Sequence, residues 1–113
     1  FQALPSLEFQ NLKVGILIND RSASAAEVFT AALKEHGRAW VIGEKSYGKG
    51  VVQKLFPLSN GAALQMTVSH YYTPSGRMIE GVGIAPNQVY PMPHELKDES
   101  YVEHVAEILI NRR

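Results

Sequence analysis

The chain has 113 residues, of which 45% are hydrophobic, and this size fits one globular domain with a modest core. Eleven lysine and arginine residues balance eleven aspartate and glutamate residues, so no net charge attracts nucleic acid or an anionic membrane surface. The absence of cysteine excludes disulfides, thiolate nucleophiles and cysteine-bound zinc. We therefore expect no nucleic-acid partner.

The ends of the chain carry no recognisable targeting segment. No apolar run reaches the roughly 20 residues of a membrane-spanning helix, and no signal-peptide pattern opens the sequence. The first residue is Phe1 rather than methionine. These features predict a processed product or a piece of a longer protein. Residues 1–12 lack a clear period and are interpreted as a lead-in or linker, with the domain itself over residues 13–113.

The next part of the chain predicts a strand, a helix and a second strand. Residues 13–19, "KVGILIN", form a branched apolar run typical of a buried parallel strand, and residues 38–44 form another. Between them apolar side chains recur at helical spacing, and Gly37 predicts the end of the helix. The recurring residues are Ala25, Val28, Phe29, Ala32 and Leu33. In such a βαβ unit the loop after the first strand lies at the carboxyl edge of the sheet, where catalytic groups are common.

The second half of the chain predicts an antiparallel hairpin, an irregular segment and a closing helix. Residues 51–58 and 62–73 flank "SNG", and the pair Asn60–Gly61 indicates the hairpin turn. Residues 73–77, "TPSGR", indicate another turn. Ser100 and Glu103 have the spacing of a helix start. The expected apolar face of that helix is Val102, Val105, Ala106, Leu109 and Ile110.

The stretch "GEKSYGKG", residues 43–50, has the glycine and lysine spacing of a phosphate-binding loop. A nucleotide-binding loop also needs a serine or threonine after the lysine and a helix behind it. Here Gly50 follows Lys49, and residues 51–58 have the pattern of a strand. The context therefore disfavours nucleotide binding and leaves either a solvated turn lysine or a lysine with another function.

Two serines, Ser22 and Ser24, stand where the predicted strand ends and the helix begins. A serine there lies beside the free N–H groups of the first helical turn, which can stabilise an oxyanion, so this is a plausible nucleophile site. However, Ser24 with Glu27 three residues later also fits a capping box, in which the serine only caps the start of the helix. The local sequence leaves both interpretations open.

From Val14 to Pro86 the chain resembles the tail-specific, or carboxyl-terminal processing, serine proteases, which are S41-type peptidases. The resemblance rests on "ILINDRSASAAEVF", "GRAWVIGEKSYGKGVVQ" and "LQMTVSHYYTPSGRMIEGVGIAPN", in the order and spacing of the family. It implies an α/β fold of the Clp protease and crotonase type, present here as a partial domain. It also implies a serine endopeptidase that cuts protein substrates near their carboxyl ends, in a periplasm, lumen or similar envelope compartment.

The resemblance implies roles for three residues: Ser24 is the nucleophile, Lys49 the general base and Gln53 the residue that orients the lysine. Ser22 would be a structural neighbour. A lysine can act as a base only when neutral, so we expect Lys49 to be buried enough to lower its pKa. On a strand that starts near Lys49, Gln53 would point to the same face. The resemblance implies no cofactor.

Histidine is the alternative base, but His36, His70, His94 and His104 are scattered. We expect His70 to be packed on a strand face with Leu64, Met66 and Val68. No histidine pair has metal-ligand spacing, so we expect no metal site.

The chain also departs from the family pattern. Family members usually carry an upstream segment whose glycine pair contributes to the oxyanion hole, and a PDZ domain that captures substrate tails; neither is present in these residues. We expect the N–H of Ala25 to supply one oxyanion donor, and the second would come from outside the chain. Members often have a serine where Ala26 stands and an aspartate where Asn87 stands. The alternative function is a non-catalytic binding or scaffold module, as in retinoid-binding relatives of the fold. Without the upstream strands, an open sheet edge predicts a homo-oligomer or other self-association.

Overall fold

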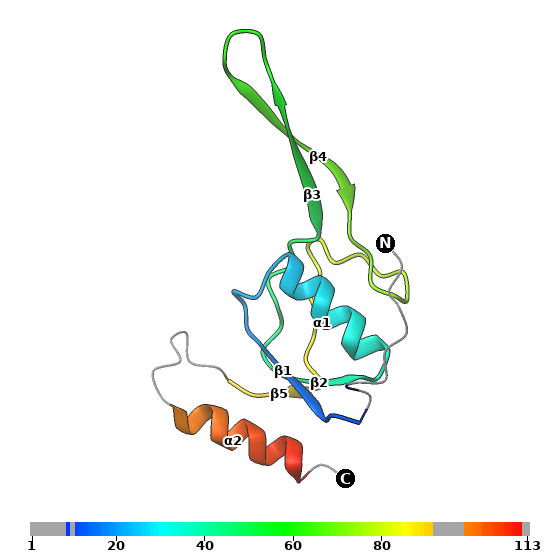
Figure 1. The fold of residues 1–113 in the computed structure, drawn as a ribbon, viewed down its shortest axis with the longest axis vertical. Coiled ribbons are helices and arrows are strands. Elements are labelled where there is room, and N and C mark those ends of the chain that lie inside the picture. Colours follow the sequence, from blue (N-terminus) through cyan, green and yellow to red (C-terminus); the bar gives the residue numbers. More distant parts are fainter. Residues whose placement is uncertain (1–8, 10, 92–98, 112–113) are drawn as a thin grey trace.

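The computed structural model describes residue 9, residues 11–91 and residues 99–111, and every structural statement below concerns these residues. Figure 1 shows a small α/β body from which a long hairpin projects. The elements in chain order are β1 (Val14–Ile18), α1 (Ala25–Glu35), β2 (Ala39–Gly43), β3 (Val51–Pro57), β4 (Ala63–His70), β5 (Gln88–Val89) and α2 (Glu99–Ile110).

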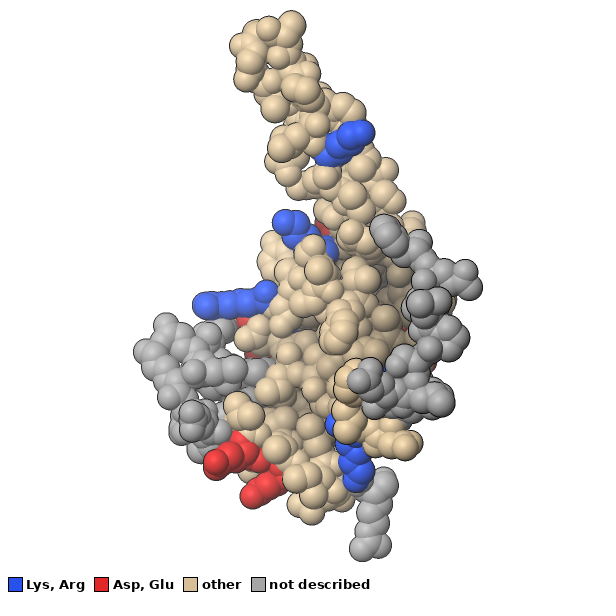
Figure 2. Space-filling model, viewed as in Figure 1, with Lys and Arg blue, Asp and Glu red and all other residues tan. Residues whose placement is uncertain are grey.

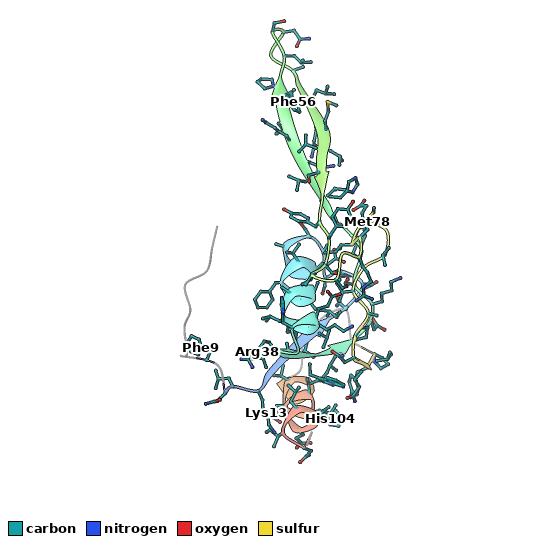
Figure 3. The ribbon with its side chains drawn as sticks, turned by 90° about the vertical axis from the view of Figure 1, so that its right-hand side faces the viewer. Phe9, Lys13, Arg38, Phe56, Met78 and His104 are labelled. Carbon is teal, nitrogen blue, oxygen red and sulfur yellow. The ribbon has the colours of Figure 1, made fainter. Side chains whose placement is uncertain are left out.

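The predicted βαβ unit is confirmed. β1 and β2 pair in parallel from Val14 opposite Ala39 to Ile18 opposite Gly43, and β5 joins β2 in parallel to give the order β1-β2-β5. Gly37 has φ 67°, so the helix ends in the left-handed conformation that glycine tolerates. The strands lie between α1 and α2 in both views (Figures 1 and 3). This topology brings the loops that follow β1 and β2 to one edge of the sheet.

The apolar residues of α1 match its buried face only in part, since Val28 packs against the core but other residues of the pattern do not. The buried residues of this helix are Glu27, Thr30 and Ala31, whereas the Phe29 side chain is 59% exposed. Periodicity places apolar side chains on one face, but the body needs the carboxylate of Glu27 inside to accept hydrogen bonds from buried N–H groups. The helix is therefore rotated relative to the apolar pattern.

The core is formed by α1, the two long parallel strands and the irregular segment before β5. Ile18, Ala31, Val41, Ile79 and Ile84 pack together in it. The predicted turn at residues 73–77 is present, since the N–H of Gly76 donates to the carbonyl of Thr73 at 2.8 Å. The segment after that turn has little regular structure, yet it supplies two core residues.

Helix α2 packs less of its apolar face than its sequence predicts. Val105 is buried, but Val102 and Ile110 are 52% and 70% exposed. Leu109 lies against Gly15 of β1, where an added Cβ would meet its Cδ1 atom. Gly15 therefore makes room for α2 at the sheet. Ser100 lies in the first turn of this helix, which begins at Glu99.

The hairpin of β3 and β4 is also confirmed, but most of its residues are exposed. All eight residues of β4 are exposed, so the expected burial of His70 is wrong. The hairpin projects beyond the body, and no other described segment covers it (Figure 1). At the turn the N–H of Gly61 donates to the carbonyl of Leu58, and Gly61 has φ 82°. A register shift beside Gln53 leaves Val68 without a residue opposite it, which is a β-bulge.

Candidate active site

Ser24 stands at the sharp turn between β1 and α1. It has φ 57° and ψ −120°, and it is the one non-glycine residue with a positive φ in the described part of the chain. This conformation is strained for a residue with a Cβ, and such strain is concentrated at functional sites. Sequence reasoning placed the serine correctly, but no residue pattern signalled the strain.

The helix start offers a free donor next to this serine. The N–H of Ala25 donates to no acceptor among the described residues. The first N–H groups of a helix lack intrahelical partners and carry the positive end of the helix dipole. Ala25 is an exposed residue. The position is suited to one donor of an oxyanion hole.

Glu27 links the turn that carries Ser24 to the turn of residues 48–50, which carries Lys49 and is called the lysine turn below. Its side chain is buried, with 1% exposure. Its Oε2 atom accepts hydrogen bonds from the N–H of Ser24 at 2.9 Å and from the N–H of Lys49 at 2.8 Å. Its Oε1 atom accepts from the Ser46 hydroxyl and from the N–H of Gly48, both at 2.6 Å. The backbones of Ser24 and Lys49 therefore meet at one carboxylate oxygen.

This role of Glu27 goes beyond the capping box that its spacing predicts. Ser24 and Glu27 keep the arrangement of that box, in which the Ser24 side chain faces the N–H of Glu27. The N–H of Glu27 donates to the backbone carbonyl of Ser24 at 2.9 Å. The S-x-x-E spacing in the sequence indicated the contact between Ser24 and Glu27. It did not reveal the hydrogen-bond partners of Glu27 beyond residue 40.

The expected burial of Lys49 is not found, because its side chain is exposed. Its glycine neighbours serve a different purpose from the one expected. A Cβ added at Gly50 would lie 2.5 Å from the backbone nitrogen of Glu80, and one at Gly48 would lie 3.0 Å from that of Gly83. Residues 79–83 lie against the two buried glycines, while Lys49 between them is exposed.

Gln53 lies on the exposed part of β3, beside the register shift. Its Oε1 atom accepts a hydrogen bond from Nε2 of Gln65 on the opposite strand, and no hydrogen bond joins it to Lys49 within the described residues. In this structure the amide is therefore held by the hairpin rather than by the lysine. Its orienting role stays a prediction.

The remaining residues singled out by the sequence have structural contacts or lie apart. The Ser22 hydroxyl accepts from the N–H of Asn19 at 3.1 Å, which fits a structural neighbour. Asn87 binds the N–H of Val41 through its Oδ1 atom at 2.9 Å. His36 and His104 are exposed, as His70 is, and His94 lies outside the described residues.

Cavities and clusters of ligating side chains do not coincide with this site. Two cavities, of about 450 and 240 Å³, are lined by residues other than Ser24 and Lys49, and the larger includes the first residues of β1 and β2. Ser24 is half-buried and Lys49 is exposed. No group of three or more histidine, aspartate or glutamate residues in the described part of the chain could hold a metal ion. The described helices also include none that is long and apolar enough to cross a membrane.

The sequence model of peptidase family S41 matches residues 3–90. The chain belongs to this peptidase family. Among curated proteins, the carboxy-terminal-processing protease of Bartonella bacilliformis is 48% identical over 86 residues, which cover 76% of this chain and 20% of the relative. The carboxyl-terminal-processing protease of Picosynechococcus is 45% identical over 76 residues, which cover 67% of this chain and 18% of the relative.

Solved structures of the S41 type show the same fold. The photosystem II D1 C-terminal processing protease superimposes with a TM-score of 0.71 at 32% identity, and the match covers 88% of this chain and 25% of that one. The α/β fold expected from the sequence, as part of a larger S41 domain, is thereby confirmed. The chain spans about a fifth of the length of the curated relatives that it matches.

Proposed function

We propose that the chain carries the catalytic serine and lysine of a serine endopeptidase that cuts polypeptides near their carboxyl ends. Ser24 is the nucleophile and Lys49 the general base. The observation that carries this proposal is the shared Oε2 atom of Glu27, which accepts from the backbone N–H of both residues. The strained turn at Ser24 and the free N–H of Ala25 support the same assignment.

The proposed reaction follows from the chemistry of these groups. The neutral amine of Lys49 takes the proton of the Ser24 hydroxyl as Oγ attacks the scissile carbonyl carbon. The Ala25 N–H donates to the oxyanion of the tetrahedral intermediate, with a second donor from another part of the enzyme. As the C–N bond breaks, the lysine ammonium returns its proton to the leaving amine. Water then releases the acyl group from Ser24 in the same way.

The exposure of Lys49 adds a condition to this proposal. Water stabilises an exposed ammonium group, whereas a base must be neutral. We propose that a bound polypeptide covers the amine during catalysis, and that Gln53 then turns from Gln65 to the lysine. The upstream catalytic segment and a PDZ domain complete the enzyme. The resemblance to the family also implies that this enzyme is located in the cell envelope. Cell fractionation tests this location.

A second candidate function is a binding or scaffold module of the same fold. Two observations favour it: Lys49 is exposed, and the Gln53 amide oxygen accepts from Gln65. Neither group is therefore arranged for catalysis in this chain. This candidate predicts that the full-length protein binds carboxyl-terminal peptides without cutting them.

The test is peptide hydrolysis by full-length protein carrying substitutions at the proposed dyad. Ser24→Ala and Lys49→Ala should each lower kcat by roughly a thousandfold or more, because members of one catalytic unit fail together. Lys49→Arg should be as inactive, since a guanidinium group keeps its proton. Gln53→Ala should lower kcat about tenfold, as expected for the loss of an orienting contact.

Lys45→Ala is the matched control, because Lys45 is an exposed lysine on the same loop. It should keep the activity of the parent. Near-normal turnover by Lys49→Arg would show that the lysine is only a fixed charge and would end the general-base proposal. A parent protein that binds peptides without hydrolysis would favour the scaffold module.

A further inference from the structure

Glu80 completes a set of carboxylate contacts around the lysine turn. It follows Ile79, which is fully buried, and its Oε2 atom accepts a hydrogen bond from the N–H of Gly50 at 2.6 Å. Glu27 accepts from the N–H groups of Gly48 and Lys49. Three consecutive backbone N–H groups therefore end on two carboxylates. Successive N–H groups beside a residue of positive φ form an anion-binding concavity, and Gly48 has φ 91°.

The carbonyl groups of the same turn are also held. The carbonyl of Gly48 accepts from the N–H of Gly81 at 2.9 Å, and that of Gly50 accepts from the N–H of Tyr71 at 2.6 Å. With Glu27 on one side and Glu80 on the other, the peptides that flank Lys49 have little freedom to rotate. The direction in which the Lys49 side chain leaves the backbone is thus set by contacts outside the side chain.

We propose that Glu80 is a positioning residue for Lys49, which it acts on through the peptide between Lys49 and Gly50. This inference rests on the proposed function, in which Lys49 is the base. Glu80 contributes a single acceptor at a half-buried position, whereas Glu27 makes four contacts inside the body. Glu80 can therefore be changed with less effect on the fold than Glu27.

The test compares substitutions of Glu80 in the full-length protein. Glu80→Ala should lower kcat about tenfold with KM nearly unchanged, because small misplacement of a catalytic group slows the chemical step. Glu80→Gln should retain most of the activity, since its amide oxygen can accept from Gly50. Glu80→Asp keeps the charge on a side chain one methylene shorter, so it should resemble Glu80→Ala. Glu103→Ala removes an exposed carboxylate from α2 and should match the parent.

Hydrogen–deuterium exchange of the peptide containing residues 48–50 gives a readout independent of activity. Exchange there should be faster in Glu80→Ala than in the parent or in Glu80→Gln, at an equal melting temperature. An unchanged kcat in Glu80→Ala together with an inactive Lys49→Ala would overturn this inference alone. Full activity in Lys49→Ala would instead overturn the proposed function. If Glu80→Gln lost as much activity as Glu80→Ala while folded, the acceptor role of Glu80 would be wrong.

Discussion

Two glycines of this chain, Gly48 and Gly50, are required by contacts with a segment about 30 positions further along the sequence. Gly50 has no side chain because the backbone of Glu80 and the Cβ of Ile79 occupy that space, at 2.5 and 2.7 Å from where a Cβ would lie. Gly48 adds a positive φ to a similar contact. Both positions are set by packing against residues 79–83, which only the folded chain provides.

Gly50→Ala should therefore destabilise the chain. Forcing a methyl group against backbone atoms costs about 1–3 kcal/mol in a packed interior, and the loss should appear as a lower midpoint in urea denaturation. Gly76→Ala is the comparison, because Gly76 has φ 82° and no atom near its missing Cβ, so it reports conformational strain alone. Equal stability of Gly50→Ala and the parent would show that residues 79–83 can move away.

Glu35 forms the clearest ion pair among the described residues. Its Oε1 atom lies 2.6 Å from Arg77, and its side chain is 13% exposed, against 71% for Arg77. The Arg77 hydrogen bond is the main cause that lowers the pKa of Glu35 to about 2; burial opposes it, and the N–H and hydroxyl of Ser75 and the hydroxyl of Thr73 add to the lowering. A carboxylate with a lowered pKa stabilises the folded state above its ordinary pKa and loses this effect as it becomes protonated.

Arg77→Ala should lower the melting temperature by a nearly constant amount above pH 4.5, and the difference should shrink between pH 4.5 and 2. Salt should reduce the difference, since solvent reaches the exposed guanidinium group. Melting curves of both proteins over this range provide the measurement. A difference that grew as the pH fell would contradict the pairing.

At the scale of elements, α1 shows how a helix can be rotated from its apolar pattern. The buried carboxylate of Glu27 accepts four hydrogen bonds, and an unsatisfied buried N–H costs more than an exposed apolar side chain. The helix therefore turns Glu27 and Thr30 inward and leaves Phe29 outside.

Phe29→Ala should change the unfolding free energy of this chain by less than about 1 kcal/mol, as expected for an exposed position. Ile42→Ala in β2 should cost about 2–5 kcal/mol, because Ile42 is fully buried. Denaturation of the two variants tests the helix orientation. A large loss for Phe29→Ala would indicate that the apolar face is packed after all.

At the scale of the whole molecule, the chain exposes much apolar surface. Figure 2 shows the projecting hairpin nearly free of charged side chains, and Leu64, Met66 and Val68 on β4 are each about half exposed. Phe56 stands on the same ribbon (Figure 3). β1 forms one edge of its sheet, since the strand order is β1-β2-β5. Unpaired edges and apolar patches of this kind favour association.

We propose that this chain self-associates through the hairpin face that carries Leu64, Met66 and their cross-strand neighbours Phe56 and Lys54. Met66→Lys should shift sedimentation toward the monomer, because it replaces an apolar side chain with a second positive charge opposite Lys54. Thr67→Lys places the same charge on the other face and should leave the association intact. A parent chain that sediments as a monomer at high concentration would contradict the proposal.

The sequence by itself determined the family and the elements other than the short strand β5. Branched apolar runs predict β1 and β2, helical spacing and Gly37 predict α1, and the turn residues predict the hairpin, because these signals depend on neighbours a few residues apart. The motifs around Ser24 and Lys49 were likewise sufficient to recognise an S41-type peptidase.

Only the tertiary structure decided how the candidate site is held. The strain at Ser24 and the exposure of Lys49 are seen only in the folded chain. The contacts of Glu27 with Lys49 and of Glu80 with Gly50 join residues 20 or more positions apart. Parallel pairing of β1 with β2 and the return of residues 79–83 bring these residues together. The spacing of apolar residues along the sequence does not show which backbone N–H groups become buried when the chain folds. Those buried N–H groups need acceptors, and the carboxylates of Glu27 and Glu80 lie where they provide them.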